Sequence, residues 1–392
     1  MSVETITLGC RLNFAESETL ARNVPDDGEW IVVNSCAVTG EAVRHTRQAI
    51  RRAHRRRPDA RILVTGCAAE LDPESFAAMD GVERIVGNAG KLNAFGANDV
   101  MTPVPSGFQG KARSFVAVQT GCDHRCTFCS IWQARGPSRS FPFEAVRDAC
   151  QQEIERGAKE IVLTGVDITD VTGGLGNLCQ RLFDTLPRLG RLRLSSLDSV
   201  EIDEPLFELI AGEPRLMPHF HLSLQAGDDL VLKRMKRRHS RADAVRTVER
   251  IKSARPDATI GADLIAGFPT ETEEMALNSL KLLDDCDIIA AHVFPFSPRA
   301  NTPAGRMPQV APATVKARAA RLRATASSRR EGWLEALNGA RMNVLIENGG
   351  KGHADNFAPV AIAGSRRGDF GPARITRRSG DHLVAEFMSF AA

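Results

Sequence analysis

The chain has 392 residues, of which 43% are hydrophobic and 25% charged, ordinary values for a globular protein of two or three domains. The formal net charge is +3, and no apolar run reaches the roughly 18 residues that a membrane-spanning helix needs. The first residues lack the basic and apolar regions of a signal peptide, so we expect a cytoplasmic protein with no membrane partner.

Residues 1–100 alternate short apolar runs with amphipathic stretches. The predicted strands are Val3–Leu8, Trp30–Asn34, Arg61–Thr65 and Val82–Val86. The predicted helices between them are Phe14–Arg22, Glu41–Arg57 and Pro73–Met79. This alternation predicts an α/β domain with a doubly wound parallel sheet, followed by a linker over residues 87–110, which are rich in Gly, Asn and Pro.

Residues 108–337 continue the alternation over a longer stretch. The predicted strands are Phe115–Gln119, Glu160–Leu163, Arg191–Ser195, His219–Leu224, Thr259–Ile265 and Ile288–Phe294. Because most of them precede a predicted helix, we expect a partial parallel β/α barrel, which carries its chemistry at the carboxyl ends of its strands.

Residues 338–392 change character and contain short strands separated by Gly, Asp and Arg. The predicted strands are Val344–Ile346, Phe357–Ile362, Ala373–Thr376 and Leu383–Phe387. They predict a small all-β barrel, a shape that often binds nucleic acids.

The strongest chemical signal is the C-x3-C-x2-C spacing of Cys122, Cys126 and Cys129, directly after a predicted strand. Three thiolates on one loop can bind three irons of a 4Fe–4S cluster and leave the fourth iron open. An open iron is what a radical S-adenosylmethionine (SAM) enzyme needs, because it chelates the amino and carboxylate groups of SAM. Zinc is the alternative, but it prefers four closed ligands, and the sequence has no second cysteine pair or histidine pair nearby.

A second set of cysteines is spread along the chain: Cys10, Cys36 and Cys67 each follow a predicted parallel strand. Since carboxyl ends of parallel strands meet at one edge of a sheet, the three thiols should converge and could bind a second cluster. The alternative is that they are small buried hydrophobic residues. We interpret Cys150, Cys179 and Cys286, which lie in predicted helices, as structural.

Several motifs then resemble the methylthiotransferase family of radical SAM enzymes across nearly the whole chain. They are TLGCRLN at 7–13 with Glu16, NSCAVT at 34–39, VTGCA at 64–68, QTGC at 119–122, RGPSRS at 135–140, LTGVD at 163–167, RLSS at 193–196, LSLQ at 222–225, DLIAGFP at 263–269 and HVFPFSPR at 292–299. The last segment resembles a TRAM domain, a small RNA-binding barrel.

The resemblance implies two 4Fe–4S clusters, held by the two cysteine sets, and two uses of SAM: as a methyl donor to sulfur and as a radical source. It implies attachment of a methylsulfur group to C2 of the adenine at tRNA position 37. It also implies a SAM site formed by Gly165, Val166, Ser195, Ser196, Gln225, Gly267 and Pro269. The expected partners are the tRNA anticodon stem-loop, an electron donor protein and a sulfur donor.

Within the family, the GCRLN and RGPSRS motifs are most similar to the threonylcarbamoyladenosine tRNA branch. The alternatives are the branches that act on isopentenyladenosine in tRNA or on a ribosomal protein side chain. A non-enzymatic RNA-binding protein with structural clusters is a third hypothesis, which the open-site ligand sets disfavour.

Three clusters of basic residues, within 44–57, 233–241 and 318–330, could contact RNA phosphates. Each could equally be a solvated helix face.

Overall fold

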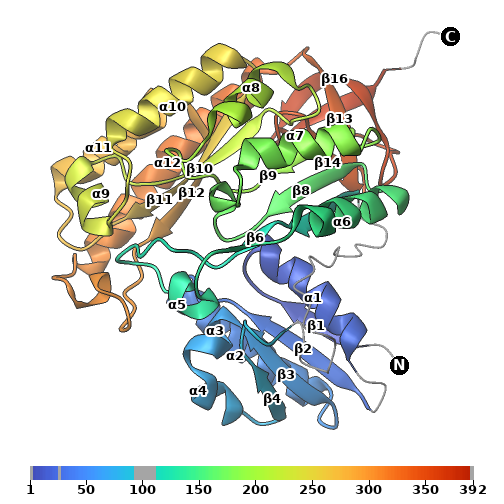
Figure 1. Ribbon diagram of the computed structural model, residues 1–392. Coiled ribbons are helices and arrows are strands. Elements are labelled where there is room, and N and C mark those ends of the chain that lie inside the picture. Colours follow the sequence, from blue (N-terminus) through green and yellow to red (C-terminus); the bar gives the residue numbers. More distant parts are fainter. Residues whose placement is uncertain (1–2, 25–27, 92–111, 389–392) are drawn as a thin grey trace.

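The computed structural model describes residues 3–24, 28–91 and 112–388. Figure 1 shows an N-terminal α/β unit in blue below a central barrel-like unit, with a small all-β unit in red beside the central one. No helix within these ranges is long and apolar enough to cross a membrane.

The N-terminal unit is a parallel sheet with strand order β1-β2-β3-β4, formed by β1 (Glu4–Thr7), β2 (Trp30–Ser35), β3 (Arg61–Gly66) and β4 (Val82–Val86). On one face, Leu20 of α1 (Arg11–Asn23) packs against Val32 and Leu63. The other face is covered by α2 (Gly40–Arg56), α3 (Cys67–Leu71) and α4 (Pro73–Ala77). From these helices, Ile50 of α2 and Phe76 of α4 pack in one cluster with Val33 of β2. The predicted sheet with helices on both faces is confirmed.

The central unit contains two three-stranded parallel sheets that together form a partial barrel. One sheet has the order β5-β8-β9, with β5 (Arg113–Ala117), β8 (Glu160–Thr164) and β9 (Leu192–Leu194). The other has the order β10-β11-β12, with β10 (His219–Gln225), β11 (Thr259–Ala266) and β12 (Ile288–Pro295). Single parallel bridges from Leu192 to Leu216 and from Leu197 to Leu222 join them, so the predicted partial barrel is confirmed.

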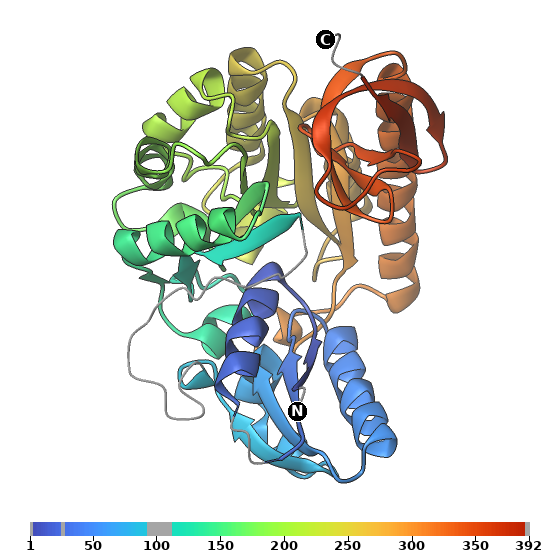
Figure 2. The same cartoon turned by 90° about the vertical axis from the view of Figure 1, so that its right-hand side faces the viewer.

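Helices cover the outer face of the partial barrel, as Figure 2 shows. They are α6 (Phe143–Glu155), α7 (Leu175–Thr185), α8 (Glu204–Gly212), α10 (Arg241–Ala254), α11 (Glu273–Asp285) and α12 (Pro312–Ala336). Alternate strand residues such as Val116, Leu222 and Leu264 face them in the main hydrophobic core. Side chains alternate along a strand, so the residues between these face inward, and several of them, such as Glu160 and Arg193, are charged. Cys150 and Cys179 are buried in α6 and α7, whereas Cys286 is the buried residue that caps α11.

Short elements after β5 were not predicted from the sequence. They are the antiparallel pair β6 (Gln119–Thr120) and β7 (Arg139–Ser140), α5 (Ile131–Arg135), the 3-10 helix η2 (Ile168–Asp170), α9 (Asp229–Met235) and the 3-10 helix η3 (Ala304–Arg306). Each is too short to show a hydrophobic period. Of the predicted linker, the part up to residue 91 belongs to the N-terminal unit, and the remainder lies outside the described residues.

The C-terminal unit is a closed barrel with the order β13-β14-β15-β17-β16. Its strands are β13 (Arg341–Asn348), β14 (Lys351–Ala354), β15 (Pro359–Ala361), β16 (Phe370–Ser379) and β17 (His382–Phe387). The predicted all-β barrel is confirmed, although β14 was missed because its sequence, KGHA, has no apolar run.

The turn between β14 and β15 lies against the amino ends of the central strands. Arg191 at the start of β9 pairs with Asp355, and Thr259 of β11 donates a hydrogen bond to the carbonyl oxygen of Asn356 (2.7 Å). Arg113 of β5 pairs with Glu347 of β13 (2.6 Å). The small barrel therefore covers one end of the partial barrel, opposite the carboxyl edge.

Candidate functional site

The loop with Cys122, Cys126 and Cys129 lies between β6 and α5, at the carboxyl edge of the partial barrel. Gly121 precedes it with φ +80°, and a Cβ there would lie 1.9 Å from the carbonyl oxygen of Pro137. The N–H of Cys122 donates to the carbonyl oxygen of Gly136 (3.1 Å). Only glycine fits this turn, which holds the cysteine loop against the segment that follows α5.

The three thiols of this loop are close enough to influence one another. Burial raises the pKa of Cys122 to about 12, with Asp167 and the other two thiols acting in the same direction. Burial also raises the pKa of Cys129 to about 11, whereas the amide of Ile131, 3.3 Å from its Sγ, opposes this shift. Arg237 places Nη1 3.7 Å from the Sγ of Cys126. Three soft donors beside a guanidinium fit an anionic metal–sulfur cluster.

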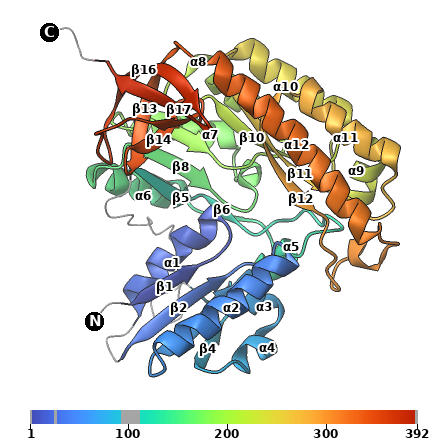
Figure 3. The same cartoon turned by 180° about the vertical axis from the view of Figure 1, so that it is seen from behind.

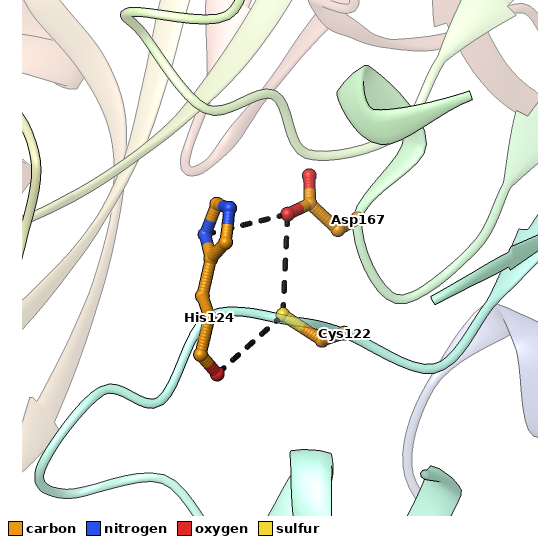
Figure 4. A group of neighbouring side chains, drawn as sticks. All are labelled: Cys122, His124 and Asp167. Carbon is orange, nitrogen blue, oxygen red and sulfur yellow. Dashed lines mark hydrogen bonds and ion pairs between the residues drawn. The ribbon is translucent and has the colours of Figure 1, made fainter. Parts of the chain in front are cut away.

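A polar cluster adjoins Cys122, as Figure 4 shows. Oδ2 of Asp167 lies 4.0 Å from the Sγ of Cys122 and 3.5 Å from Nδ1 of His124. Contact with Glu201 raises the pKa of His124, and burial raises that of Asp167. Sequence reasoning gave neither side chain a role, although Asp167 ends the LTGVD motif and His124 lies between Cys122 and Cys126.

The second cysteine set converges at the carboxyl edge of the N-terminal sheet, as expected from its strand positions. Cys10 precedes α1 after β1, Cys36 directly follows β2, and Cys67 directly follows β3. Gly9 has φ +94°, and a Cβ there would lie 2.7 Å from the Sγ of Cys36. Burial raises the pKa of Cys36 to about 11, and the thiols of Cys10 and Cys67 act in the same direction.

The two cysteine sets face each other across the junction of the two units. The pKa of Cys129, raised by burial, is raised further by Cys67 from the N-terminal unit. Nδ2 of Asn88 lies 3.8 Å from the Sγ of Cys67 and donates to the carbonyl oxygen of Ala134 in α5 (2.7 Å). Helices α3 and α5 lie side by side at this junction (Figures 1 and 3).

A buried ion cluster beside the second cysteine set fixes this junction. Nη1 of Arg135 in α5 lies 2.8 Å from Oε1 of Glu16 in α1, and Lys91 pairs with the same carboxylate. Nη2 of Arg135 donates to Oδ1 of Asn13 (2.6 Å). Burial alone would raise the pKa of Glu16, but Arg135 and Lys91 lower it to about 2. Two cations and one anion leave a net positive charge next to Cys10. Burial raises the pKa of Cys10, and the charge of Arg135 opposes this rise.

The residues predicted for SAM all lie at the carboxyl edge of the partial barrel. Gly165 and Val166 follow β8, Ser195 and Ser196 follow β9, Gln225 ends β10, and Gly267 and Pro269 follow β11. The N–H of Val166 already donates to Oε1 of Gln119 (3.1 Å), a residue to which sequence reasoning gave no role.

Gly267 also has a packing role. Its φ is +74°, and a Cβ there would lie 2.6 Å from the side chain of Val315 in α12. Its N–H donates to Oε1 of Glu271 (3.1 Å). The turn after β11 therefore holds α12 close to the barrel.

The three basic clusters differ in structure. In the second and third clusters, most arginines bind acids of the fold: Arg237 binds Asp198, Arg238 binds Glu201, Arg241 binds Asp285, Arg318 binds Glu271, and Arg329 binds Asp284 and Asp287. In the first, Arg44, Arg51, Arg52 and Arg55 are exposed on α2 and have no ion pair among the described residues. The cluster on α2 is therefore the one whose arginines remain available to bind phosphates.

Comparison with known proteins agrees with this geometry. The Radical SAM superfamily matches residues 116–283, and the Uncharacterized protein family UPF0004 matches residues 2–87. The solved structure of the radical S-adenosylmethionine methyltransferase TsrM from Kitasatospora setae, with tryptophan substrate and a SAM analog bound, is 16% identical. Its TM-score is 0.55, and the match covers 77% of this chain and 74% of TsrM. The partial barrel and the cysteine loop at its edge define a radical SAM enzyme, with SAM and a 4Fe–4S cluster as cofactors.

The similar sequences define the family more narrowly. The threonylcarbamoyladenosine tRNA methylthiotransferase MtaB of Rickettsia prowazekii is 42% identical, over 92% of this chain and 91% of its own. The MtaB of Thermotoga maritima is 31% identical, over 98% and 96%. A tRNA-2-methylthio-N(6)-dimethylallyladenosine synthase of Ruegeria sp. is 29% identical, over 97% and 98%. The chain belongs to the MtaB family of threonylcarbamoyladenosine tRNA methylthiotransferases.

Replacing Glu16 should destabilise the junction. The Glu16→Gln variant leaves Arg135 and Lys91 buried without a carboxylate, which should lower the free energy of unfolding by roughly 3–5 kcal/mol. The matched control is Glu29→Gln, because the Glu29–Arg57 pair lies at the surface, where solvent screens it, and should contribute little to stability. Thermal unfolding followed by circular dichroism measures both, and equal midpoints for the two variants would contradict the role of the ion cluster.

The pH dependence of stability gives a second test, which compares the wild type with the Glu16→Gln variant. The pKa of Glu16 is about 2 in the folded protein against an ordinary value of 4.5, so its stabilising effect is complete above about 4.5. It is lost as the pH falls toward 2. The stability difference between the wild type and Glu16→Gln should therefore shrink over this acidic range and be constant near neutral pH.

Proposed function

We propose that the protein adds a methylthio group to C2 of N6-threonylcarbamoyladenosine at position 37 of tRNA, in the cytoplasm. The observation that carries this proposal is the pair of three-cysteine sets that face each other at the edges of two parallel sheets. The comparison with known proteins supports the proposal through the 42% identity to an MtaB over nearly the whole of both chains.

Each cysteine set would hold one 4Fe–4S cluster with an open iron. When bound, the cluster at Cys122, Cys126 and Cys129, with SAM, supplies the radical that removes hydrogen from C2, and the cluster at the other set supplies a site for sulfur. The positive charges near both sets favour anionic clusters: Arg237 lies beside Cys126, and Arg135 lies near Cys10. The amides near Cys129 and Cys67 would donate to cluster-bound sulfur.

The residues around the carboxyl edge would orient SAM. We assign its binding to Gly165, Val166, Ser195, Ser196, Gln225, Gly267 and Pro269. Because Oδ2 of Asp167 lies 4.0 Å from the Sγ of Cys122, its carboxylate is also well placed for the ammonium group of SAM. Gln119 holds the backbone of this segment through the N–H groups of Val166 and Asp167 (3.1 and 2.9 Å).

The RNA would approach over the N-terminal unit, where α2 carries exposed arginines. Recognition of an unpaired loop is the usual mode for RNA, and a base must leave its stack to reach a buried reacting group. The small C-terminal barrel is the second candidate for contact with the anticodon stem-loop. Reductive cleavage consumes electrons and each product takes up a sulfur atom, so an electron donor protein and a sulfur donor complete the set of partners.

Nucleoside analysis tests the function directly. Transfer RNA from cells that lack this gene should contain threonylcarbamoyladenosine without the methylthio group, and expression of the wild-type chain should restore the group. Mass spectrometry of digested tRNA measures this. A methylthio group that instead returns on isopentenyladenosine, or on a ribosomal protein peptide, would contradict the proposal in favour of one of the other two branches.

Iron content tests the second cluster. Anaerobically reconstituted wild-type protein should contain about eight irons per chain, because each cluster contains four. Changing Cys122, Cys126 and Cys129 together to Ala should leave about four, as should changing Cys10, Cys36 and Cys67. The matched control is Cys286→Ala, which removes a buried cysteine outside both sets and should leave the iron content unchanged. A wild-type value near four would remove the second cluster.

Salt dependence tests the α2 face. Changing Arg51, Arg52 and Arg55 to Ala should weaken tRNA binding and flatten the slope of log affinity against log salt by about 0.7–0.9 for each lost phosphate contact. Arg57→Ala, at the residue that caps the carboxyl end of α2, is the control, because Arg57 is bound to Glu29 (2.6 Å). Binding titrations at several salt concentrations decide between the two roles of this helix face. An unchanged slope in the triple variant would mean that RNA binds elsewhere.

A further inference from the structure

The amino-end half of the inner face of the partial barrel is densely charged. Glu160, at the start of β8, binds Arg193 (2.8 Å) and Arg191 (2.9 Å). Arg113 binds Glu347, and Arg191 also binds Asp355, as described above. These contacts use all the carboxylates of the group, which are Glu160, Glu347 and Asp355.

Arg11 adds a further guanidinium to this group from the N-terminal unit. It is the first residue of α1, which begins beside the partial barrel (Figure 3), and its guanidinium lies 5.6 Å from the ring centre of Phe115 in β5. The side chain is half-buried, and among the described residues it makes no hydrogen bond and no ion pair. The charged groups near it include Arg113 and Arg193, which repel it, and Glu160 and Glu347, which already bind other arginines.

Arg193, behind Arg11, is also incompletely paired. Its side chain is only 2% exposed, and Nη1 has no hydrogen-bond partner in the described part of the chain. The four guanidiniums of Arg11, Arg113, Arg191 and Arg193 therefore meet three carboxylates. His219 does not add charge, because burial and the nearby Arg193 hold its pKa well below its ordinary value. One negative charge is missing from the group.

Another acid of the partial barrel, Asp263, is already occupied. Oδ1 of Asp263 in β11 lies 3.0 Å from Nε2 of His221 and 3.1 Å from Nδ1 of His292. Arg11 thus has no carboxylate of the described chain to bind, and an unpaired, desolvated guanidinium favours an anionic ligand.

We infer that Arg11, backed by Arg193, binds the carboxylate of the threonylcarbamoyl group of the target nucleoside and so selects this nucleoside. The inference rests on the proposed function. Threonine linked to the carbamoyl carbon through its amino nitrogen keeps a free carboxylate, which a planar guanidinium fork binds with two hydrogen bonds. N6 and C2 lie on the same edge of adenine, and Arg11 directly follows Cys10. A base with C2 between the cysteine sets therefore directs its N6 substituent toward this group, where an apolar dimethylallyl substituent would leave the charge unpaired.

The test compares two anticodon stem-loops with reconstituted wild-type protein. One carries threonylcarbamoyladenosine, and the other carries the primary amide in place of the threonine carboxylate. The wild type should prefer the acid by roughly 10²-fold or more in kcat/KM, and in binding measured without SAM. Arg11→Met should lose this preference for the acid, whereas Arg11→Lys should keep part of it. Arg156→Met, at the exposed residue that caps the carboxyl end of α6 and pairs with Glu153, is the matched control and should keep the full preference.

The outcomes separate the two proposals. Equal use of acid and amide by the wild type, or a full preference retained by Arg11→Met, would overturn the role of Arg11 and leave the proposed function intact. A wild type that methylthiolates neither stem-loop would overturn the proposed function, and this inference with it. If Arg11→Met fails to load iron, the acid and amide comparison in the wild type and in Arg11→Lys still decides.

Discussion

The arrangement of the candidate site depends on one buried interaction, the pairing of Glu16 with Arg135 and Lys91. Glu16 belongs to the helix that follows the first cysteine of one set, and Arg135 belongs to the helix that follows the last cysteine of the other. Their contact holds the carboxyl edges of two separate sheets against each other. Because a buried ion pair is strongly destabilised when one partner is lost, the junction resists small displacements of either cysteine set.

The same interaction shapes the electrostatics of the junction. It contains one more cation than anion, and Arg299 extends the positive charge toward Cys36. At the other end of the inner face, Arg11 and Arg193 leave a second excess of positive charge. We interpret the first as complementary to anionic clusters and the second as complementary to an anionic substrate group. A radical enzyme must place both accurately, since a reacting carbon displaced by about 1 Å loses much of its rate.

The cysteine sets could be predicted from the sequence because their signal is local. Cys10, Cys36 and Cys67 each follow an apolar strand, and parallel strands bring such positions together. The ion cluster could not be predicted, because Glu16 and Arg135 lie 119 positions apart and neither residue type indicates its partner. The basic clusters illustrate the same limit: sequence alone does not distinguish Arg318, bound to Glu271, from Arg51, which is exposed. Strand β14 was missed for a different reason, since its sequence, KGHA, has no apolar run and only its neighbours in the barrel define it.

The most direct measurement follows a single hydrogen atom. A stem-loop with deuterium at C2 of its threonylcarbamoyladenosine is incubated with reconstituted protein, SAM, a sulfur source and a reductant, and the 5′-deoxyadenosine formed is analysed by mass spectrometry. Deuterium should appear in 5′-deoxyadenosine as the methylthio group appears at C2, and Cys10→Ala should still cleave SAM but form no methylthio product. Methylthio product formed while the 5′-deoxyadenosine remains unlabelled would contradict this prediction.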